Sequence, residues 1–240
     1  MKPLRVIIVG GSSGLGAELA RQLAARGDEV AILARRADAL EAVARFQPDR
    51  IRTYPHDVTH TDEAAALFED ICRDLGGLDL LIYAAGIMPQ IEPNEFDTEK
   101  DQAIFRVNVE GAIAWCNLAA TRFQAVGAGT LVGIGSVAGD RGRPGHPAYH
   151  ASKAALATYL ESLRNRLWRS GVRVITIKPG PLDTPMTQHL SMAKMPVAVA
   201  AKKIIRGLNR DGEQYLQLSH RLIFAVLRLL PSAIFRRIRR

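Results

Sequence analysis

A glycine-rich loop near the start of the chain constrains its fold more than any other feature. Residues 4–9 form a mostly apolar, β-branched run, which leads into Gly10-Gly11-Ser12-Ser13-Gly14-Leu15-Gly16 and then into a helical pattern over 17–26. In this context glycines allow a tight turn and a close approach to a pyrophosphate, whose charge is attracted by the free N–H groups of the helix start. The sequence therefore predicts a dinucleotide-binding loop. A tight turn without a ligand is the alternative.

The same alternation of strand and helix patterns continues along the chain. Short apolar runs predict further strands at 29–34, 51–54, 79–83, 129–135 and 172–178. Helical patterns lie between or after them, over 37–46, 61–74 with Thr61 as the N-cap, 98–126 and 149–168. This order predicts an α/β fold, a Rossmann-type doubly wound parallel sheet of about seven strands with helices on both faces.

Length and composition favour one large domain. No linker, repeat or low-complexity tract divides the 240 residues, so we expect a single NADP-binding catalytic domain over 1–220 and a basic tail over 221–240. Cys72 and Cys116 have no metal-ligand spacing and form no disulfide framework, which suits a cytoplasmic protein without a metal. No segment reaches the length of a signal-peptide core or a membrane span.

The basic character of the chain is concentrated in its tail. Six of the last twenty residues are arginines and none is acidic, and without them the formal net charge falls from +8 to +2. This distribution argues against nucleic-acid binding. Apolar residues over 222–230, and again at Ile234, Phe235 and Ile238, predict an interfacial amphipathic segment with peripheral membrane contact. Packing of 222–230 on the protein's own sheet or across a dimer is the alternative.

The end of the second predicted strand indicates which dinucleotide the loop takes. In a dinucleotide-binding unit this point meets the adenosine ribose, where an acid accepts from a free 2′-hydroxyl. Here Ala34 leaves space and Arg35-Arg36 follow, and two guanidinium groups suit a 2′-phosphate because arginine pairs bidentately with phosphate oxygens. We therefore expect NADP(H). Solvated arginines at a helix start are the alternative.

Further candidate residues lie at the carboxyl ends of strands, where open α/β sheets bind ligands. Asp57-Val58 follow the third predicted strand, and Ala84-Ala85-Gly86 follow the fourth. Asp57 can accept from an adenine amino group or serve only as a turn residue. Asn108 lies inside a helical pattern although asparagine is a poor helix former, which indicates either a surface residue or a buried hydrogen bond to a neighbouring strand.

A tyrosine and a lysine at helical spacing form the candidate catalytic pair. Tyr149 and Lys153 lie four residues apart at the start of a predicted helix, and Ser136 lies thirteen residues upstream. An ammonium one turn from the phenol lowers the pKa of the tyrosine towards the range that suits a proton donor. Ser136 can hold a substrate oxygen beside the phenol. A chance pair on a solvated helix is the alternative for this pair alone.

Taken together, these motifs resemble the short-chain dehydrogenase/reductase family. The similarity covers roughly residues 4–218 and includes GGSSGLG (10–16), DV (57–58), AAG (84–86), NV (108–109), GSVAG (135–139), YHASK (149–153) and PGPLDT (179–184). The resemblance implies a catalytic tetrad. In it Tyr149 exchanges a proton with the substrate oxygen, Lys153 lowers the pKa of that tyrosine and binds the nicotinamide ribose, Ser136 orients the substrate, and Asn108 holds a water.

The resemblance also implies the cofactor contacts. They lie in the glycine loop, after four of the strands and in the tetrad: Gly10, Ser12, Ser13, Gly14, Leu15, Gly16, Arg35, Arg36, Asp57, Val58, Ala84, Ala85, Gly86, Tyr149, Lys153, Pro179, Gly180 and Thr184. The chain departs from the family at Val9 and Tyr83, where a threonine and an asparagine usually tie strands together. The Asp-Gly-Gly often found after the last strand is missing, so we expect a homodimer rather than a tetramer.

These features predict an NADP(H)-dependent oxidoreductase that interconverts a ketone or aldehyde and an alcohol, with Tyr149 as acid/base. An apolar small-molecule substrate is expected because Met88, Met186, Met192 and Met195 follow the fourth or sixth strand, and flexible thioethers suit adaptable apolar surfaces. Filling of the core is the alternative for these methionines. The segment 183–197 is expected to form a mobile lid. A non-catalytic NADP-binding sensor or scaffold that docks through its tail is the alternative.

Overall fold

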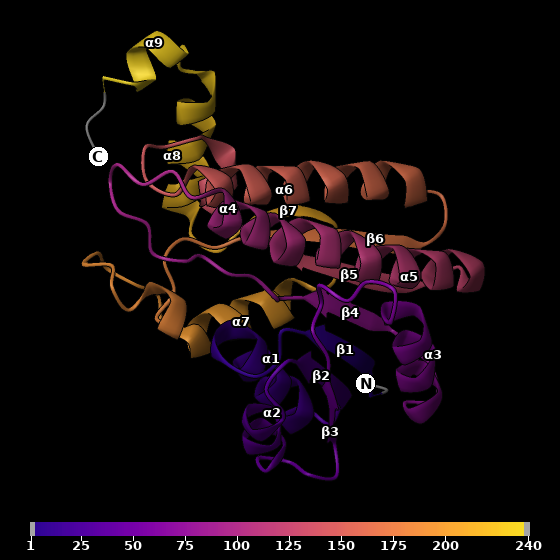
Figure 1. Ribbon diagram of the computed structural model, residues 1–240. Coiled ribbons are helices and arrows are strands. Elements are labelled where there is room, and N and C mark those ends of the chain that lie inside the picture. Colours follow the sequence, from indigo (N-terminus) through magenta and orange to yellow (C-terminus); the bar gives the residue numbers. More distant parts are fainter. Residues whose placement is uncertain (1–2, 238–240) are drawn as a thin grey trace.

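The computed structural model describes residues 3–237, and within this range a seven-stranded parallel sheet forms the centre of the fold (Figure 1). The strand order is β3-β2-β1-β4-β5-β6-β7. The strands are β1 (Arg5–Val9), β2 (Glu29–Ala34), β3 (Ile51–Pro55), β4 (Leu80–Tyr83), β5 (Gly129–Ile134), β6 (Val172–Lys178) and β7 (Gly212–Tyr215). The predicted Rossmann-type doubly wound sheet is therefore confirmed.

Helices cover both faces of this sheet. One face carries α1 (Gly14–Ala25), α2 (Ala37–Ala44) and α7 (Val197–Gly207), and the other carries α3 (Ala64–Asp74), α5 (Gly111–Val126) and α6 (Pro147–Leu167). The helix α4 (Thr98–Phe105) packs against α6. Shorter helical turns are η1 (Arg106–Glu110), η2 (Val137–Asp140) and η3 (Pro185–Thr187).

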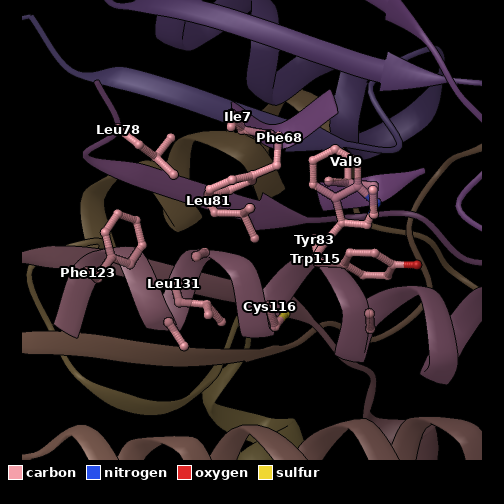
Figure 2. Packing of buried hydrophobic residues seen from close by; sticks show 14 of the residues in the cluster. Ile7, Val9, Phe68, Leu78, Leu81, Tyr83, Trp115, Cys116, Phe123 and Leu131 are labelled. Atoms are coloured by element: carbon pink, nitrogen blue, oxygen red, sulfur yellow. The ribbon is translucent and has the colours of Figure 1, made fainter. Parts of the chain in front are cut away.

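Both faces of the central strands are buried, which explains why those strands read as continuous apolar runs. In β1, Val6 and Ile8 contribute to the core beneath α1 and α7, whereas Ile7 and Val9 contribute to the core beneath α3 and α5. Figure 2 shows the second of these cores, in which the rings of Phe68 and Trp115 pack edge to face. Burial of each such side chain stabilises the fold by about 2–3 kcal/mol.

Several helices differ in extent from the sequence-based expectation. The helix predicted from residue 17 begins already at Gly14, inside the glycine loop. The Thr61 N-cap is wrong, because Glu63 N donates to His60 O in a preceding turn and the helix begins only at Ala64. The long helical region over 98–126 is present, but a π-helical turn at Arg106–Glu110 interrupts it.

The tail forms two helices, α8 (Leu218–Leu229) and α9 (Ser232–Phe235), which extend from one end of the sheet (Figure 1). Phe224 is buried and Arg228 pairs with Asp140, so one side of α8 packs on the protein. The start of a separate tail at residue 221 stays a prediction. Its last members, Ile238, Arg239 and Arg240, lie outside the described residues. Between residues 3 and 237 no helix combines the length and apolar character needed to cross a membrane.

Candidate active site

A cleft of about 360 Å³ lies at the carboxyl ends of the strands. It sits where the strand order reverses, between β1 and β4, which is the position at which open α/β sheets bind ligands. Every residue that the resemblance implied as a cofactor contact lines this cleft, together with Ser136. Residues that the motifs did not single out also line it, among them His56, Ile87 and Ile134.

The glycine loop is shaped by close backbone approaches that no side chain would permit. Gly10 has φ +93°, and a Cβ placed there would lie 2.4 Å from the Ala85 nitrogen. A Cβ at Gly16 would lie 2.1 Å from the Gly10 oxygen. Ser13, the N-cap of α1, makes no side-chain cap bond, so the first N–H groups of that helix face the cleft without a capping oxygen. Such N–H groups attract an anion.

Arg35 and Asp57 lie close to one another in the lining of the cleft. The Arg35 side chain is 68% exposed, and its guanidinium lies 4.0 Å from an Asp57 carboxylate oxygen. The other Asp57 oxygen accepts from the backbone N–H and the hydroxyl of Thr59, at 3.0 and 2.9 Å. Burial opposes ionisation of Asp57, but the Thr59 hydrogen bonds outweigh it and the pKa is lowered. Asp57 is thus a turn residue whose second oxygen still faces Arg35.

Ser136 and Tyr149 meet in the middle of the cleft. The Ser136 side chain caps η2 by accepting from Ala138 N at 3.0 Å, and it also hydrogen-bonds to the Tyr149 phenol. The loop between them approaches α6 closely, since a Cβ at Gly139 would lie 2.6 Å from the Lys153 carbonyl carbon. Burial raises the pKa of Tyr149, while the Ser136 hydrogen bond and the charge of Arg143 act in the opposite direction.

Lys153 is buried one turn along α6, as its spacing predicts. Its ammonium donates to the Ile134 carbonyl at 2.9 Å and lies 5.8 Å from the centre of the Tyr149 ring. Burial lowers the pKa of Lys153 to about 8. The expected lowering of the Tyr149 pKa is therefore absent from this state, because the phenol is desolvated and the ammonium bonds a backbone oxygen instead.

Asn108 is fully buried within the π-helical turn. Its side-chain oxygen accepts from Ile87 N at 2.8 Å, and its amide nitrogen donates to Ile87 O and to the Ser152 hydroxyl, both at 3.1 Å. The side chain therefore ties the segment after β4 to α6. π-turns inside α-helices are frequent at functional sites. Asn108 is thus buried and hydrogen-bonded rather than on the surface, but its partners lie in the segment after β4 and in α6, not in a neighbouring strand.

Tyr83 stands where the family usually has an asparagine that links two strands, and it makes a different contact. Its buried hydroxyl donates to the Val107 carbonyl at 2.5 Å, in the same π-turn (the hydroxyl is visible in Figure 2). The neighbouring Gly111 is required, because a Cβ there would lie 2.7 Å from the Tyr83 oxygen. Although Tyr83 departs from the family pattern, its hydroxyl therefore makes a hydrogen bond that connects β4 to the π-turn.

The sequence missed those site contributions that the backbone makes. The Ile134 carbonyl holds Lys153, yet nothing in a sequence marks a backbone oxygen as an acceptor.

Of the four methionines, Met186 lines the cleft, Met195 packs on the core and Met192 is exposed. Cys72 and Cys116 are buried free thiols. Among residues 3–237 no three His, Cys, Asp or Glu side chains are grouped as metal ligands.

The fold and this cleft define a doubly wound α/β protein with a site for an anionic ligand at the glycine loop. The family model for short chain dehydrogenases matches residues 5–194, and this chain belongs to that family. It is therefore an oxidoreductase by family, and the sensor or scaffold alternative is not favoured.

Relatives of known name and structure agree with this family. The chain is 33% identical to an uncharacterized oxidoreductase of Myxococcus xanthus, over 95% of this chain and 93% of the relative. It is also 33% identical to the cis-4-hydroxycyclohexanecarboxylate dehydrogenase of Sinomonas cyclohexanicum, covering 86% of this chain and 84% of that one. A short chain dehydrogenase from Burkholderia cenocepacia, solved with NADP, superposes with a TM-score of 0.86 at 25% identity, covering 99% and 98% of the two chains.

Proposed function

We propose that this protein is an NADP(H)-dependent oxidoreductase that interconverts an apolar ketone or aldehyde and the corresponding alcohol, with Tyr149 as the acid/base. The observation that carries the proposal is that Ser136, Tyr149 and Lys153 converge on the cleft that also contains the glycine loop. A proton donor and an anion-binding loop in one cleft suit a reaction that moves a hydride and a proton together.

The residues present fit a dinucleotide phosphate. The glycine loop forms a cradle that a Cβ would fill, and the start of α1 directs N–H groups towards a pyrophosphate. Arg35 is largely exposed at the cleft edge, and Arg36 lines the same end, so both can pair with a 2′-phosphate. The Burkholderia cenocepacia structure solved with NADP supports this choice. When bound, NADP(H) supplies or accepts the hydride.

The chain's own residues handle the proton and the substrate oxygen. Ser136 holds that oxygen against the Tyr149 hydroxyl, which gives the proton during reduction and takes it during oxidation. The Lys153 ammonium, one helical turn away, favours the phenolate that forms when the proton leaves. Asn108 supports the site indirectly, because its three side-chain hydrogen bonds hold Ile87, which lines the cleft, and Ser152, which precedes Lys153 in α6.

An apolar substrate is supported by the walls of the cleft near Tyr149. Ile87, Val107, Leu182 and Met186 line it, and hydrophobic lining with a few placed polar groups is typical of small-molecule sites. A panel of ketones, aldehydes and alcohols, followed by NADPH consumption or formation, tests the proposal. Absence of turnover across the panel by a folded, NADP-saturated protein would overturn it.

The tail adds a proposal about location. The side of α8 opposite its buried Phe224 carries an exposed apolar stripe, with Leu222 62%, Val226 60% and Leu229 85% exposed. The described part of the tail, 221–237, carries four arginines and no acid, and one of these arginines, Arg228, is paired with Asp140 and Glu213. We infer that the stripe rests on an anionic membrane surface, where an apolar face with basic neighbours is stabilised. The homodimer stays a prediction, and no interface is assigned to it.

A further inference from the structure

The tail helix α8 reaches the wall of the cleft through His220. Gly180 lines the cleft, and a Cβ added to it would lie 2.7 Å from His220 Nδ1 and still closer to Cε1. His220 lies outside the lining of the cleft, so its imidazole packs directly behind the Gly180 backbone. Only a glycine at this position allows the contact, because a Cβ does not approach another heavy atom so closely.

Backbone hydrogen bonds hold the residues on either side of Gly180. The Pro179 carbonyl accepts from Val137 N at 3.1 Å. The Pro181 carbonyl accepts from Met195 N at 2.9 Å. These two bonds fix the flanking carbonyls, and the imidazole limits how far the glycine between them can move away from the cleft.

His220 is itself held by an anchored helix. His220, Phe224 and Arg228 follow one another at four-residue intervals and therefore share one face of α8. The imidazole and the buried Phe224 ring pack edge to face, with their centres 6.3 Å apart. Arg228 pairs with Asp140 near the other end of the helix. The imidazole behind the cleft wall thus has a firm support.

The buried Nδ1 of His220 argues against a purely structural role. Within residues 3–237 this nitrogen has no hydrogen-bond partner. Burial also lowers the pKa of His220, which favours the neutral ring. A buried polar atom without a partner destabilises a fold, and an apolar side chain would pack here without that cost. A role in shaping the cleft gives a reason for a flat, compact ring at this position.

Gly180 lies on the catalytic side of the cleft. Its neighbour Pro179 accepts from Val137 N, and Val137 follows Ser136 in the chain. Arg35, the proposed partner of the 2′-phosphate, follows β2, whereas Gly180 follows β6, and β1, β4 and β5 lie between those two strands. Four strand spacings correspond to about 20 Å. In the proposed function, the wall at Gly180 therefore adjoins the nicotinamide half of the cofactor and not its adenosine half.

We propose that His220 is a positioning residue, which holds the Gly180 backbone in place for the nicotinamide half of NADP(H). The imidazole acts through the glycine and touches neither cofactor nor substrate. The helix α8 is thereby part of the cofactor site. The identity of the ligand rests on the proposed function, whereas the contact between His220 and Gly180 does not.

A comparison of two ligands tests this role. NADPH and 2′-phospho-ADP-ribose, which lacks the nicotinamide, are titrated by calorimetry into the wild type, His220→Ala and Leu222→Ala. We expect His220→Ala to weaken NADPH about three- to tenfold and to leave 2′-phospho-ADP-ribose unchanged. Leu222→Ala changes an exposed side chain of the same helix and should match the wild type for both ligands. Unchanged NADPH binding by His220→Ala would overturn the proposal, and so would equal weakening of both ligands, which a merely structural role would cause.

A double-mutant cycle tests whether His220 acts through Gly180. Gly180 does not have a positive φ, so its backbone suits alanine, and the atoms nearest to the added methyl all belong to the imidazole. We expect Gly180→Ala to weaken NADPH. The double variant Gly180→Ala with His220→Ala should bind NADPH more tightly than Gly180→Ala, because the methyl then has room. Losses that simply add would show that the two residues act independently and would end the proposal.

These outcomes also separate the inference from the proposed function. If the wild type binds neither ligand, the NADP(H) assignment is wrong and the inference falls with it. If both ligands and the cycle behave as expected but no carbonyl or alcohol turns over, the proposed reaction fails while the positioning role of His220 stands.

Discussion

The Lys178 ammonium lies 2.8 Å from the Asp140 carboxylate, and both side chains are almost completely buried. Lys178 also lies 2.6 Å from Glu213 of β7, and Arg228 of α8 pairs with both acids. This network joins the end of β6, the turn that begins at Ser136, the last strand and the tail. It holds the back of the proposed catalytic segment without entering the cleft.

Removing one charge of this network should destabilise the protein. Lys178→Met leaves Asp140 with one cation fewer in a buried place, and we expect the free energy of unfolding to fall by about 3 kcal/mol. Urea denaturation provides the measurement. The double variant Asp140→Asn with Lys178→Met should regain part of the loss, because the uncompensated charge is gone. A double variant less stable than the single one would contradict this account.

Arg35 should determine the choice of NADP(H) over NAD(H). Arg35→Ala removes a charge-assisted contact to the 2′-phosphate that is worth on the order of 1.5–3 kcal/mol, so NADP affinity should fall about tenfold or more. NAD affinity should not change, because NAD lacks that phosphate. Fluorescence titration with both cofactors measures the effect, and Arg45→Ala, an exposed arginine away from the cleft, is the matched control. An NADP preference that survives Arg35→Ala would refute the assignment.

Tyr149→Phe should separate chemistry from binding. The substitution keeps the ring and removes the proton, so turnover should fall by about 10² to 10⁴ while NADPH still binds. Steady-state rates and a cofactor titration on the same preparation give both quantities. Turnover within a few-fold of the wild type would exclude Tyr149 as the acid/base.

The buried Lys153 ammonium should make the free energy of unfolding depend on pH. Its pKa falls from 10.5 in the unfolded chain to about 8 in the fold because burial disfavours the charged form. Between these values the unfolded state binds more protons than the folded state, so this group makes stability increase with pH across that window. Below about pH 8 the cost is fully present, at most about 3 kcal/mol.

The variant Lys153→Met should remove this cost. In the cofactor-free protein it should be more stable than the wild type at neutral pH, and the difference should shrink as the pH approaches 10.5. Denaturation curves across the range measure it, with the exposed Lys202→Met as control. A stability difference that does not vary with pH would show that the ammonium carries no such cost.

The stripe on α8 should govern binding to anionic vesicles. Replacing Leu222, Val226 and Leu229 by serine removes exposed apolar surface without touching Phe224, so the fold should persist while co-sedimentation is lost. Each tail arginine near the surface adds about 1 kcal/mol, so neutral vesicles should bind the wild type weakly. A control variant carries serine at three exposed apolar positions elsewhere, Phe96, Val126 and Trp168. Equal sedimentation of both variants would refute a role for the stripe.

The sequence predicted the sheet because its strands are buried on both faces and its helices alternate with them. Val6 to Val9 form such a run, and the glycines that follow are required by approaches of about 2–3 Å, which leave no other residue possible at Gly10 and Gly16. The spacing of Tyr149 and Lys153 likewise follows from one helical turn. Features of this kind can be predicted from the sequence because they depend on residues that are close to one another in the chain.

Other features of the site depend on contacts between distant segments, which no local pattern encodes. The π-turn at Asn108 is held by Ile87, Ser152 and the Tyr83 hydroxyl, all from other elements. The Lys153 ammonium finds its acceptor in the Ile134 carbonyl, so its expected effect on Tyr149 is not seen in this state. The partners of Arg228 are equally hidden, since Asp140 lies 88 residues earlier.

The strand order leaves β3 and β7 at the two edges of the sheet, and their composition limits what can attach there. An edge strand presents unpaired N–H and C=O groups to any extended chain that reaches it. β3 carries Arg52 and ends at Pro55, which has no N–H to donate, while β7 has only four residues and holds the charged Glu213. Short, charged or proline-ended edges oppose strand addition from other chains, so this sheet should resist edge-to-edge aggregation even when the protein is concentrated.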